Sequence, residues 1–132
     1  MNATTPRATK YTIAVLSYLQ HHNHSTNLQI VEALRQEFPE VSKTTIHRVT
    51  GRLLEQGKIR CAPPSHDNSA RFDSNVLPHD HFNCKRCDQL RDIYVPRELL
   101  QQVQSQLGKC QIDGSVVLTG VCGRCSGSKR QG

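Results

Sequence analysis

Apolar residues recur every three or four positions in three stretches of the first half of the chain, with polar turns between them. This spacing puts the apolar side chains on one face of a helix and predicts three amphipathic helices before Gly57. Ser25 or Thr26 is suited to begin the second helix and Ser42 the third, because short hydroxyl side chains accept hydrogen bonds from the first-turn N–H groups. The predicted inward-facing residues are Ile13, Leu16 and Leu19, with Tyr11 and Val15 nearby, in the first helix (about 10–20), Leu28, Val31, Leu34 and Phe38 in the second, and Ile46, Val49, Leu53 and Leu54 in the third.

A short turn joins the second and third predicted helices, which is typical of a helix-turn-helix. Lys58–Ala62 and Arg71–Phe72 are two short predicted strands on either side of the turn-rich stretch Pro63–Ser69. A hairpin directly after the recognition helix corresponds to the wing of a winged helix. A three-helix bundle with an incidental hairpin is the competing interpretation.

A second pattern follows, so we expect a first domain at 1–74, a hinge at 75–78 and a second domain at 79–132. The second domain has one predicted helix, which begins at Pro96 and ends at Gly108. The predicted class is α+β, with a winged helix-turn-helix followed by a small α/β domain. The tail 126–132 is expected to be disordered, and the three predicted strands are His79–Asn83, Leu90–Val95 and Val116–Val121.

The chain carries 17 Lys and Arg against 11 Asp and Glu, a formal net charge of +6. This balance favours polyanionic partners, although a solubilising surface explains it equally well. Basic residues exceed acidic ones by nine to six in residues 1–74 and by eight to five in 75–132, so charge does not locate an interface. No apolar run approaches the roughly 20 residues of a membrane span, and Met1–Thr9 lacks an apolar signal segment. We therefore expect a cytoplasmic protein.

Four of the six cysteines form two Cys-x2-Cys pairs, Cys84 with Cys87 and Cys122 with Cys125. This spacing lets two thiolates of each pair reach one tetrahedral metal, and four thiolates close the coordination shell of a structural zinc. Redox dithiols or disulfides are the alternatives, which a reducing compartment disfavours. The leftover cysteines, Cys61 and Cys110, are expected to be small buried hydrophobic residues.

A second group of candidate ligands combines histidine and aspartate. On a strand, His79 and His81 point the same way and can bind one metal. Asp73 precedes the hinge, Asp92 lies on the next strand, and His24 precedes the second helix. Imidazole and carboxylate ligands suit Fe(II), Mn(II) or Zn(II). Each residue alone is compatible with an ordinary surface position, but an ion joining the two domains would fix the angle between them.

The order of these motifs resembles the Fur (ferric uptake regulator) family over about residues 7–125. Such a resemblance implies a homodimeric repressor that binds a palindromic operator in double-stranded DNA, with an N-terminal winged helix and a C-terminal dimerisation domain. It implies a structural zinc on Cys84, Cys87, Cys122 and Cys125 and a regulatory metal on His24, Asp73, His79, His81 and Asp92. The motifs that carry the resemblance are Ser42-x-Thr44-Thr45-Ile46-x-Arg48, Arg71-Phe72-Asp73, His79-x-His81-x2-Cys84-x2-Cys87-x4-Asp92 and Gly120-Val121-Cys122-x2-Cys125.

Within that family, the five regulatory positions are most similar to those of the peroxide-sensing branch (PerR), where two aspartates accompany three histidines. The iron-sensing branch more often has Glu at these acidic positions. It also has an additional metal site in the dimerisation domain, which we expect to be absent here because no histidine follows His81. The zinc-sensing branch (Zur) typically has Cys where Asp73 stands, although Cys61 keeps that interpretation open. In a peroxide sensor, bound Fe(II) would lead to oxidation of His24 or His79 and release of DNA, whereas Mn(II) would resist it.

Three positions depart from the family pattern. His47 stands where the family usually has Tyr, so the base contact there is in question. Asp88 replaces the usual Gly after Cys87 and suggests a different turn, and Pro78 replaces a common acidic or histidine position.

The exposed face of the third helix near its N-terminus is predicted to enter the major groove. Arg48 would hold phosphate or read guanine, and the alternative for the whole set is a solvated helix face. Arg7 and Lys10 are further candidates for backbone contacts, and the predicted DNA-binding set is Lys43, Thr44, Thr45, His47, Arg48, Arg52 and Tyr11.

Two other functions compete with the metal-gated repressor. A metal-dependent hydrolase would need a general base beside an open metal position, and the sequence offers no spare Glu or His suitably placed. We therefore expect no enzyme activity. A zinc-stabilised DNA-binding module that never senses metal is the other alternative, which replacement of His79 and His81 would distinguish.

Overall fold

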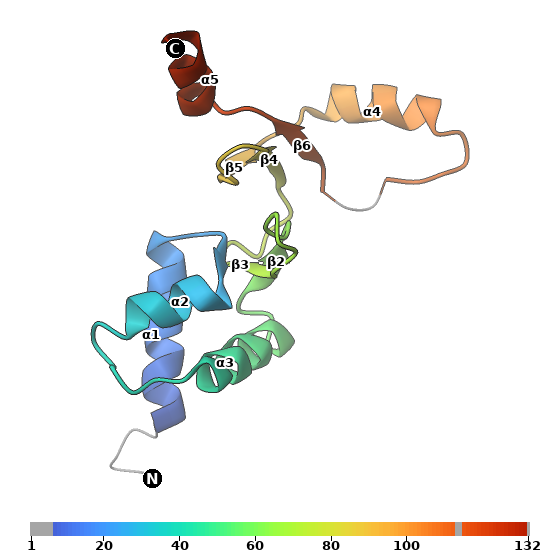
Figure 1. Ribbon diagram of the computed structural model, residues 1–132. Helices are drawn as coiled ribbons and strands as arrows, with labels where there is room; N and C mark the ends of the chain where they lie inside the picture. Colours follow the sequence, from blue (N-terminus) through green and yellow to red (C-terminus); the bar gives the residue numbers. More distant parts are fainter. Residues whose placement is uncertain (1–6, 113–114, 132) are drawn as a thin grey trace. The chain divides into compact units, whose positions relative to one another are not determined.

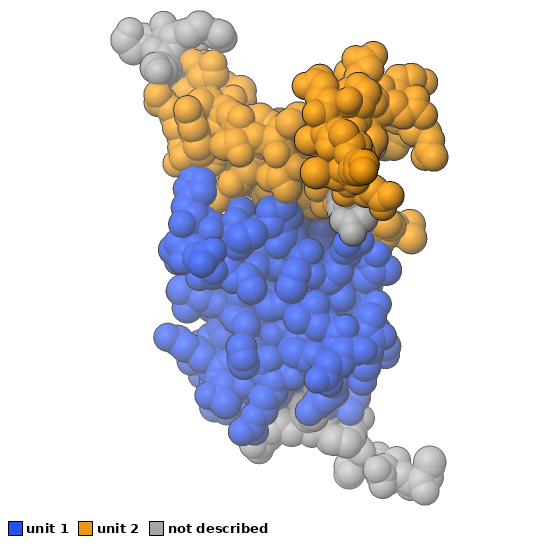
Figure 2. All heavy atoms as spheres, turned by 90° about the vertical axis from the view of Figure 1, so that its right-hand side faces the viewer, with its two compact units in different colours: residues 1–76 blue, residues 77–132 orange. Residues whose placement is uncertain are grey.

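The structure is a computed structural model that describes residues 7–112 and 115–131. The chain divides into two compact units, Met1–Val76 and Leu77–Gly132, coloured separately in Figure 2. Within the described part of the chain, none of the helices has both the length and the apolar character needed to cross a membrane.

The first unit combines helices with a small antiparallel sheet of order β1-β3-β2 (Figure 1). Thr26 caps the second helix in a capping box with Gln29, and the Ser42 side chain accepts a hydrogen bond from the N–H of Thr45 at the start of the third. The order of three helices followed by a β-hairpin confirms the predicted winged helix. Its elements are α1 (Arg7–His21), β1 (Ser25–Thr26), α2 (Asn27–Leu34), α3 (Lys43–Glu55), β2 (Arg60–Ala62) and β3 (Arg71–Asp73).

The buried face of α1 differs from the predicted one. Tyr11, Val15 and Leu19 are at most 3% exposed, because residues four apart lie on one face of a helix. Ile13 is 60% exposed on another face, and Leu28 on α2 is 52% exposed, so their prediction as inward-facing residues was wrong. The core of this unit consists of Tyr11, Val15, Leu19, Ile30, Val31, Leu34, Val41, Ile46, Val49, Leu53, Ile59 and Phe72.

The second unit is built on a sheet of order β5-β4-β6, in which β4 is antiparallel to β5 and parallel to β6. The chain between β4 and its parallel neighbour β6 contains β5 and α4, since parallel neighbours cannot be joined by a tight hairpin and need a longer connection. No residue of α4 is buried. The elements are β4 (Asp80–Cys84), β5 (Leu90–Ile93), α4 (Arg97–Gln106), β6 (Val117–Gly120) and α5 (Gly123–Gln131).

Two expectations from the sequence, one on the C-terminal tail and one on the two leftover cysteines, require correction. Residues up to 131 form α5 rather than a disordered tail from 126; the helix begins at the second cysteine pair, where the N–H of Ser126 donates to the carbonyl of Cys122 at 2.9 Å. Cys61 and Cys110 are exposed rather than buried. Cys61 lies on β2 next to buried Ala62, and successive side chains on a strand point to opposite faces.

Candidate metal centres and nucleic-acid interface

Four cysteines come together in the second unit. Cys84 ends β4, and the parallel register sets it opposite Gly120, two residues before Cys122. The Sγ atoms of Cys84 and Cys125 lie 3.8 Å apart, as do those of Cys87 and Cys122. A tetrahedron with metal–sulfur bonds of about 2.3 Å has edges of roughly 3.8 Å, so this spacing fits zinc. All four thiols are free of disulfides.

Backbone N–H groups favour the thiolate form within this cluster. The N–H groups of Cys87 and Cys122 donate to the Sγ of Cys84 at 3.5 and 3.3 Å, and they lower the pKa of Cys84 to about 6. Cys125 shares a hydrogen bond with the sulfur of Cys122, and this contact, with burial and the other sulfurs, raises the pKa of Cys125 to about 12. Four thiolates would repel one another in this cluster, and a divalent cation bound there would supply the compensating charge.

Asp88 follows the first cysteine pair directly and has a φ of 65°. This left-handed conformation is the one that glycine adopts at little cost, and aspartate is among the residues that tolerate it best. The N–H of Asp88 donates to the carbonyl of Cys84 at 2.9 Å and closes the turn. The replacement of the family's usual Gly suggested a different turn at this position. In the structure, Asp88 adopts the left-handed conformation that a glycine would also adopt.

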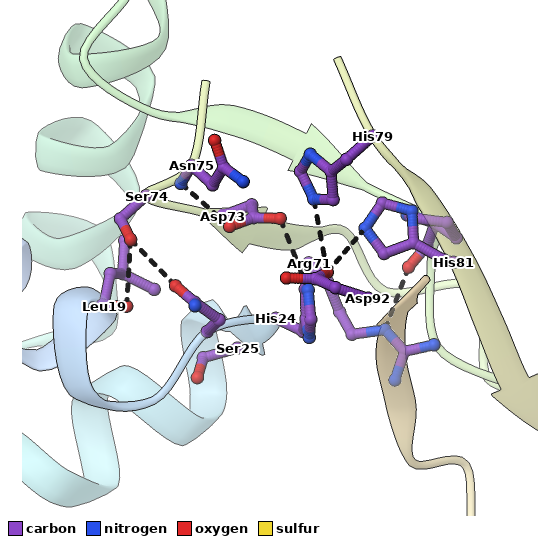
Figure 3. A network of polar contacts seen from close by, with 12 residues as sticks. Leu19, His24, Ser25, Arg71, Asp73, Ser74, Asn75, His79, His81 and Asp92 are labelled. Carbon is purple, nitrogen blue, oxygen red and sulfur yellow. Dashed lines mark hydrogen bonds and ion pairs between the residues drawn. The ribbon is translucent and has the colours of Figure 1, made fainter. Parts of the chain in front are cut away.

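In the first unit, His24 and Asp73 form one pair of candidate ligands (Figure 3). His24 precedes β1 with a φ of 67°, and its N–H donates to the carbonyl of Phe72 at 3.0 Å. Its Nε2 lies 3.3 Å from Oδ2 of Asp73, and the two side chains are 10% and 1% exposed. The other oxygen of Asp73 accepts the N–H of Asn75 at 2.9 Å. The backbone therefore holds both side chains in place.

In the second unit, His79, His81 and Asp92 form another group. The register of β4 and β5 pairs His81 with Asp92. Oδ1 of Asp92 lies 3.2 Å from Nε2 of His79 and 3.4 Å from Nε2 of His81. Two ligands on one ion at about 2.1 Å are separated by roughly 3.0–3.4 Å, so these spacings fit a shared metal.

The second ring nitrogen of His79 determines which nitrogen is available for a metal. Nδ1 of His79 lies 2.7 Å from the carbonyl oxygen of Leu77. A carbonyl only accepts hydrogen bonds, so Nδ1 carries the proton and the lone pair is on Nε2, toward Asp92. A metal-binding histidine usually makes this kind of hydrogen bond with its other nitrogen.

Asp80, between the two histidines, is a residue whose role the sequence did not indicate. Its two carboxylate oxygens accept the N–H of Val95 at 3.0 Å and the N–H of Val116 at 2.9 Å. Asp80 thereby fixes the end of β5 and the approach to β6 on either side of β4. The only available signal was its position on the opposite face of the strand from the histidines.

The predicted DNA-binding residues divide in the structure. Lys43, Thr44, His47, Arg48 and Arg52 are exposed on α3, and Thr45 is half-buried. Tyr11 is 3% exposed and packs edge-to-face on Phe38, with ring centroids 5.3 Å apart. Its assignment as a DNA contact is therefore corrected, because the ring belongs to the core. Lys10 lies over both rings, and the side chain of Arg7 lies outside the described residues.

Comparison with known proteins agrees with this arrangement. Residues 2–113 match the profile of the ferric uptake regulator family. The chain belongs to the ferric uptake regulator family. It is 31% identical over 125 residues to the peroxide-responsive repressor PerR of Staphylococcus epidermidis, covering 90% of this chain and 81% of that protein.

Solved structures of other Fur-family proteins share the fold. The ferric uptake regulator of Helicobacter pylori superposes with a TM-score of 0.73 at 20% identity, over 89% of this chain and 80% of that one. A zinc uptake regulator complexed with zinc and DNA superposes with a TM-score of 0.61 at 19% identity, over 94% and 86% of the two chains. These likenesses confirm the α+β class and the order of its parts.

Proposed function

We propose that this Fur-family chain is a metal-dependent repressor whose affinity for DNA is set by an ion bound to His24, Asp73, His79, His81 and Asp92. The observation that best supports this proposal is the division of these ligands, with two in the first unit and three in the second. Five residues, 74–78, separate Asp73 from His79. Even a fully extended connection of this length spans only about 20 Å, so the ligands of the first unit stay within reach of those of the second.

An ion that takes ligands from both groups would favour those orientations of the winged helix in which all five side chains reach it. The ion would act as a ligand that selects one conformation of a hinge. Without the ion, the winged helix would sample orientations that do not match two half-sites of an operator. A structural zinc on the four cysteines would remain in place in both states.

The ligands suit Fe(II), Mn(II) or Zn(II), and the signal we propose is peroxide with iron. This choice is supported by the peroxide-responsive relative and by aspartate at both acidic positions. Bound Fe(II) would activate the peroxide. A ring carbon of His24 or His79 would then take up one oxygen atom in a two-electron oxidation, and the other oxygen would leave as water. The alternative is a regulator of iron or zinc uptake, which would show no such oxidation.

The DNA partner in this proposal is a palindromic operator, bound in the cytoplasm by a homodimer. Exposed Lys43, Thr44, His47 and Arg48, with Thr45 and Arg52, would face the major groove from α3. Exposed apolar residues of α4, its C-cap and β6 are suited to a dimer interface, because a second copy would remove them from water. These residues are Leu99, Val103, Leu107, Val117 and Leu118.

Replacement of His79 and His81 by Ala tests the metal response. We expect the variant to keep its four-cysteine zinc but to lose the increase in DNA affinity that Mn(II) gives the wild type. His21→Ala, which alters an exposed histidine at the end of α1, is the matched control and should respond as the wild type does. An unchanged Mn(II) response in the double variant would favour a DNA-binding module without metal sensing.

Peroxide treatment of the Fe(II) form tests the signal. Mass spectrometry should detect one added oxygen on the peptides that contain His24 or His79, together with loss of DNA binding. The Mn(II) form, treated identically, should gain none. DNA binding that survives peroxide with both peptides unmodified would remove the peroxide assignment and leave an uptake regulator.

A further inference from the structure

His47, on the exposed face of α3, is held by side chains of its own unit. The Nδ2 of Asn27 lies 3.3 Å from Nδ1 of the His47 ring. The hydroxyl of Thr50 donates to Oδ1 of Asn27 at 2.9 Å. Asn27 opens α2, and Thr50 is 1% exposed on the buried face of α3, so the contact starts in the core and ends at the surface.

These contacts determine which atoms of the two side chains donate. Oδ1 of Asn27 faces the Thr50 hydroxyl, whose single proton also lies within reach of the carbonyls of Ile46 at 3.1 Å and His47 at 3.2 Å, and the Asn27 NH2 group faces His47. That NH2 group only donates, and Nδ1 of His47 must therefore accept. In the neutral ring the proton is then on Nε2, at the edge of the ring away from Asn27.

We infer that His47 is a base-reading residue that presents an Nε2–H donor to a purine N7 in the major groove, and that Asn27 and Thr50 are positioning residues for it. The inference rests on the proposed DNA-binding function. Purine N7 is an acceptor at A and G alike, and guanine adds O6 beside it. A ring held in one orientation with an N–H at its free edge has a directional donor for a base edge, whereas a phosphate contact needs no such orientation.

The test uses the full chain, loaded with zinc and Mn(II), and the duplex that it selects from a random-sequence library. Purines of that duplex are replaced one at a time by 7-deazapurines, which lack N7. We expect one position in each half-site at which the substitution weakens wild-type binding about three- to tenfold, as the loss of one hydrogen bond predicts. His47→Ala should bind more weakly by a similar factor and should be insensitive to deazapurine at that position.

The positioning role has its own measurement. Asn27→Ala and Thr50→Val should each weaken binding about two- to threefold at most, because the ring loses its fixed orientation but keeps its donor. In the double variant Asn27→Ala/His47→Ala, the effect of Asn27→Ala should disappear. A merely structural effect of Asn27 would lower affinity equally on both backgrounds and would overturn the positioning role. His21→Ala, a histidine exposed on α1, should leave the deazapurine profile unchanged.

The remaining outcomes distinguish failure of the His47 base contact from failure of the proposed repressor function. A wild type that selects a duplex but tolerates every 7-deazapurine overturns the base contact and leaves the repressor intact. A His47→Ala loss that is uniform across all duplexes identifies a phosphate contact instead and also overturns it. A wild type that selects no duplex with Mn(II) overturns the repressor proposal and the contact with it.

Discussion

The two units of the chain differ in what holds them together. The first has a cluster of twelve buried residues from its three helices, the turn between α2 and α3, the residue before β2, and β3. In the described part of the second, the buried apolar residues are Cys84, Leu90 and Cys122, and α4 buries none of its residues. The first unit is therefore stabilised by hydrophobic burial, whereas we expect the second to depend on a metal and on a partner that covers its exposed helix.

The largest expected effect is on the second unit alone. Cys122→Ser removes a buried ligand sulfur, and the metal-binding free energy of small zinc domains, about 10–16 kcal/mol, is the free energy that folds them. We expect loss of bound zinc and of amide-exchange protection in β4, β5 and β6, while α1–α3 stay protected. Amide exchange followed by mass spectrometry gives both results on the full chain.

Cys61→Ser is the matched control for that experiment. Cys61 is exposed and belongs to the first unit, so its substitution should keep the zinc and change stability by at most about 0.5 kcal/mol. If Cys122→Ser retained its zinc and its exchange protection, the dependence of the second unit on the metal would be refuted.

Truncation of a core residue should destabilise the first unit and leave the second unchanged. Leu19→Ala leaves a cavity at a fully buried position of α1, and we expect it to lower the free energy of unfolding of the first unit by about 2–5 kcal/mol. The zinc content should not change. Ile13→Ala, six residues earlier on the exposed face of α1, should lower the free energy of unfolding by less than about 0.5 kcal/mol. Equal losses in the two variants would contradict the assigned core face.

A smaller effect is expected at Asp80. Asp80→Ala leaves the N–H groups of Val95 and Val116 without the carboxylate, and we expect a loss of about 1–3 kcal/mol in the second unit. Faster amide exchange at those two residues would identify the cause. Arg91→Ala, at an exposed position of β5, is the control, and similar exchange in both variants would remove the role assigned to Asp80.

Features that depend on neighbouring residues could be predicted from the sequence, and features that depend on distant residues could not. Caps and helical spacing predicted α2 and α3, because Thr26 and Ser42 act within their own first turn. Local spacing also predicted the cysteine cluster. The face of α1 was misjudged at Ile13, since periodicity alone admits neighbouring faces when apolar residues are dense. The roles of Asp80 and Asn27 depend on partners 15 to 36 residues away along the chain, which local patterns do not encode.

The contrast between the units also bears on regulation. A stable DNA-binding unit could keep its fold while its orientation changes, and a second unit held by zinc would provide the fixed base for three of the five proposed regulatory ligands. Occupation of the regulatory site would then alter orientation rather than folding, which is what a reversible sensor requires.

The most direct test measures DNA affinity with and without the regulatory ion while the cysteine zinc stays bound. Fluorescence anisotropy of a selected duplex would be titrated with the zinc-containing chain, with Mn(II) present or absent, for the wild type, His24→Ala and His79→Ala. The account predicts that Mn(II) strengthens wild-type binding, and that loss of a ligand from either unit removes this increase. Equal affinity of the wild type with and without Mn(II), or a normal increase in both variants, would contradict it.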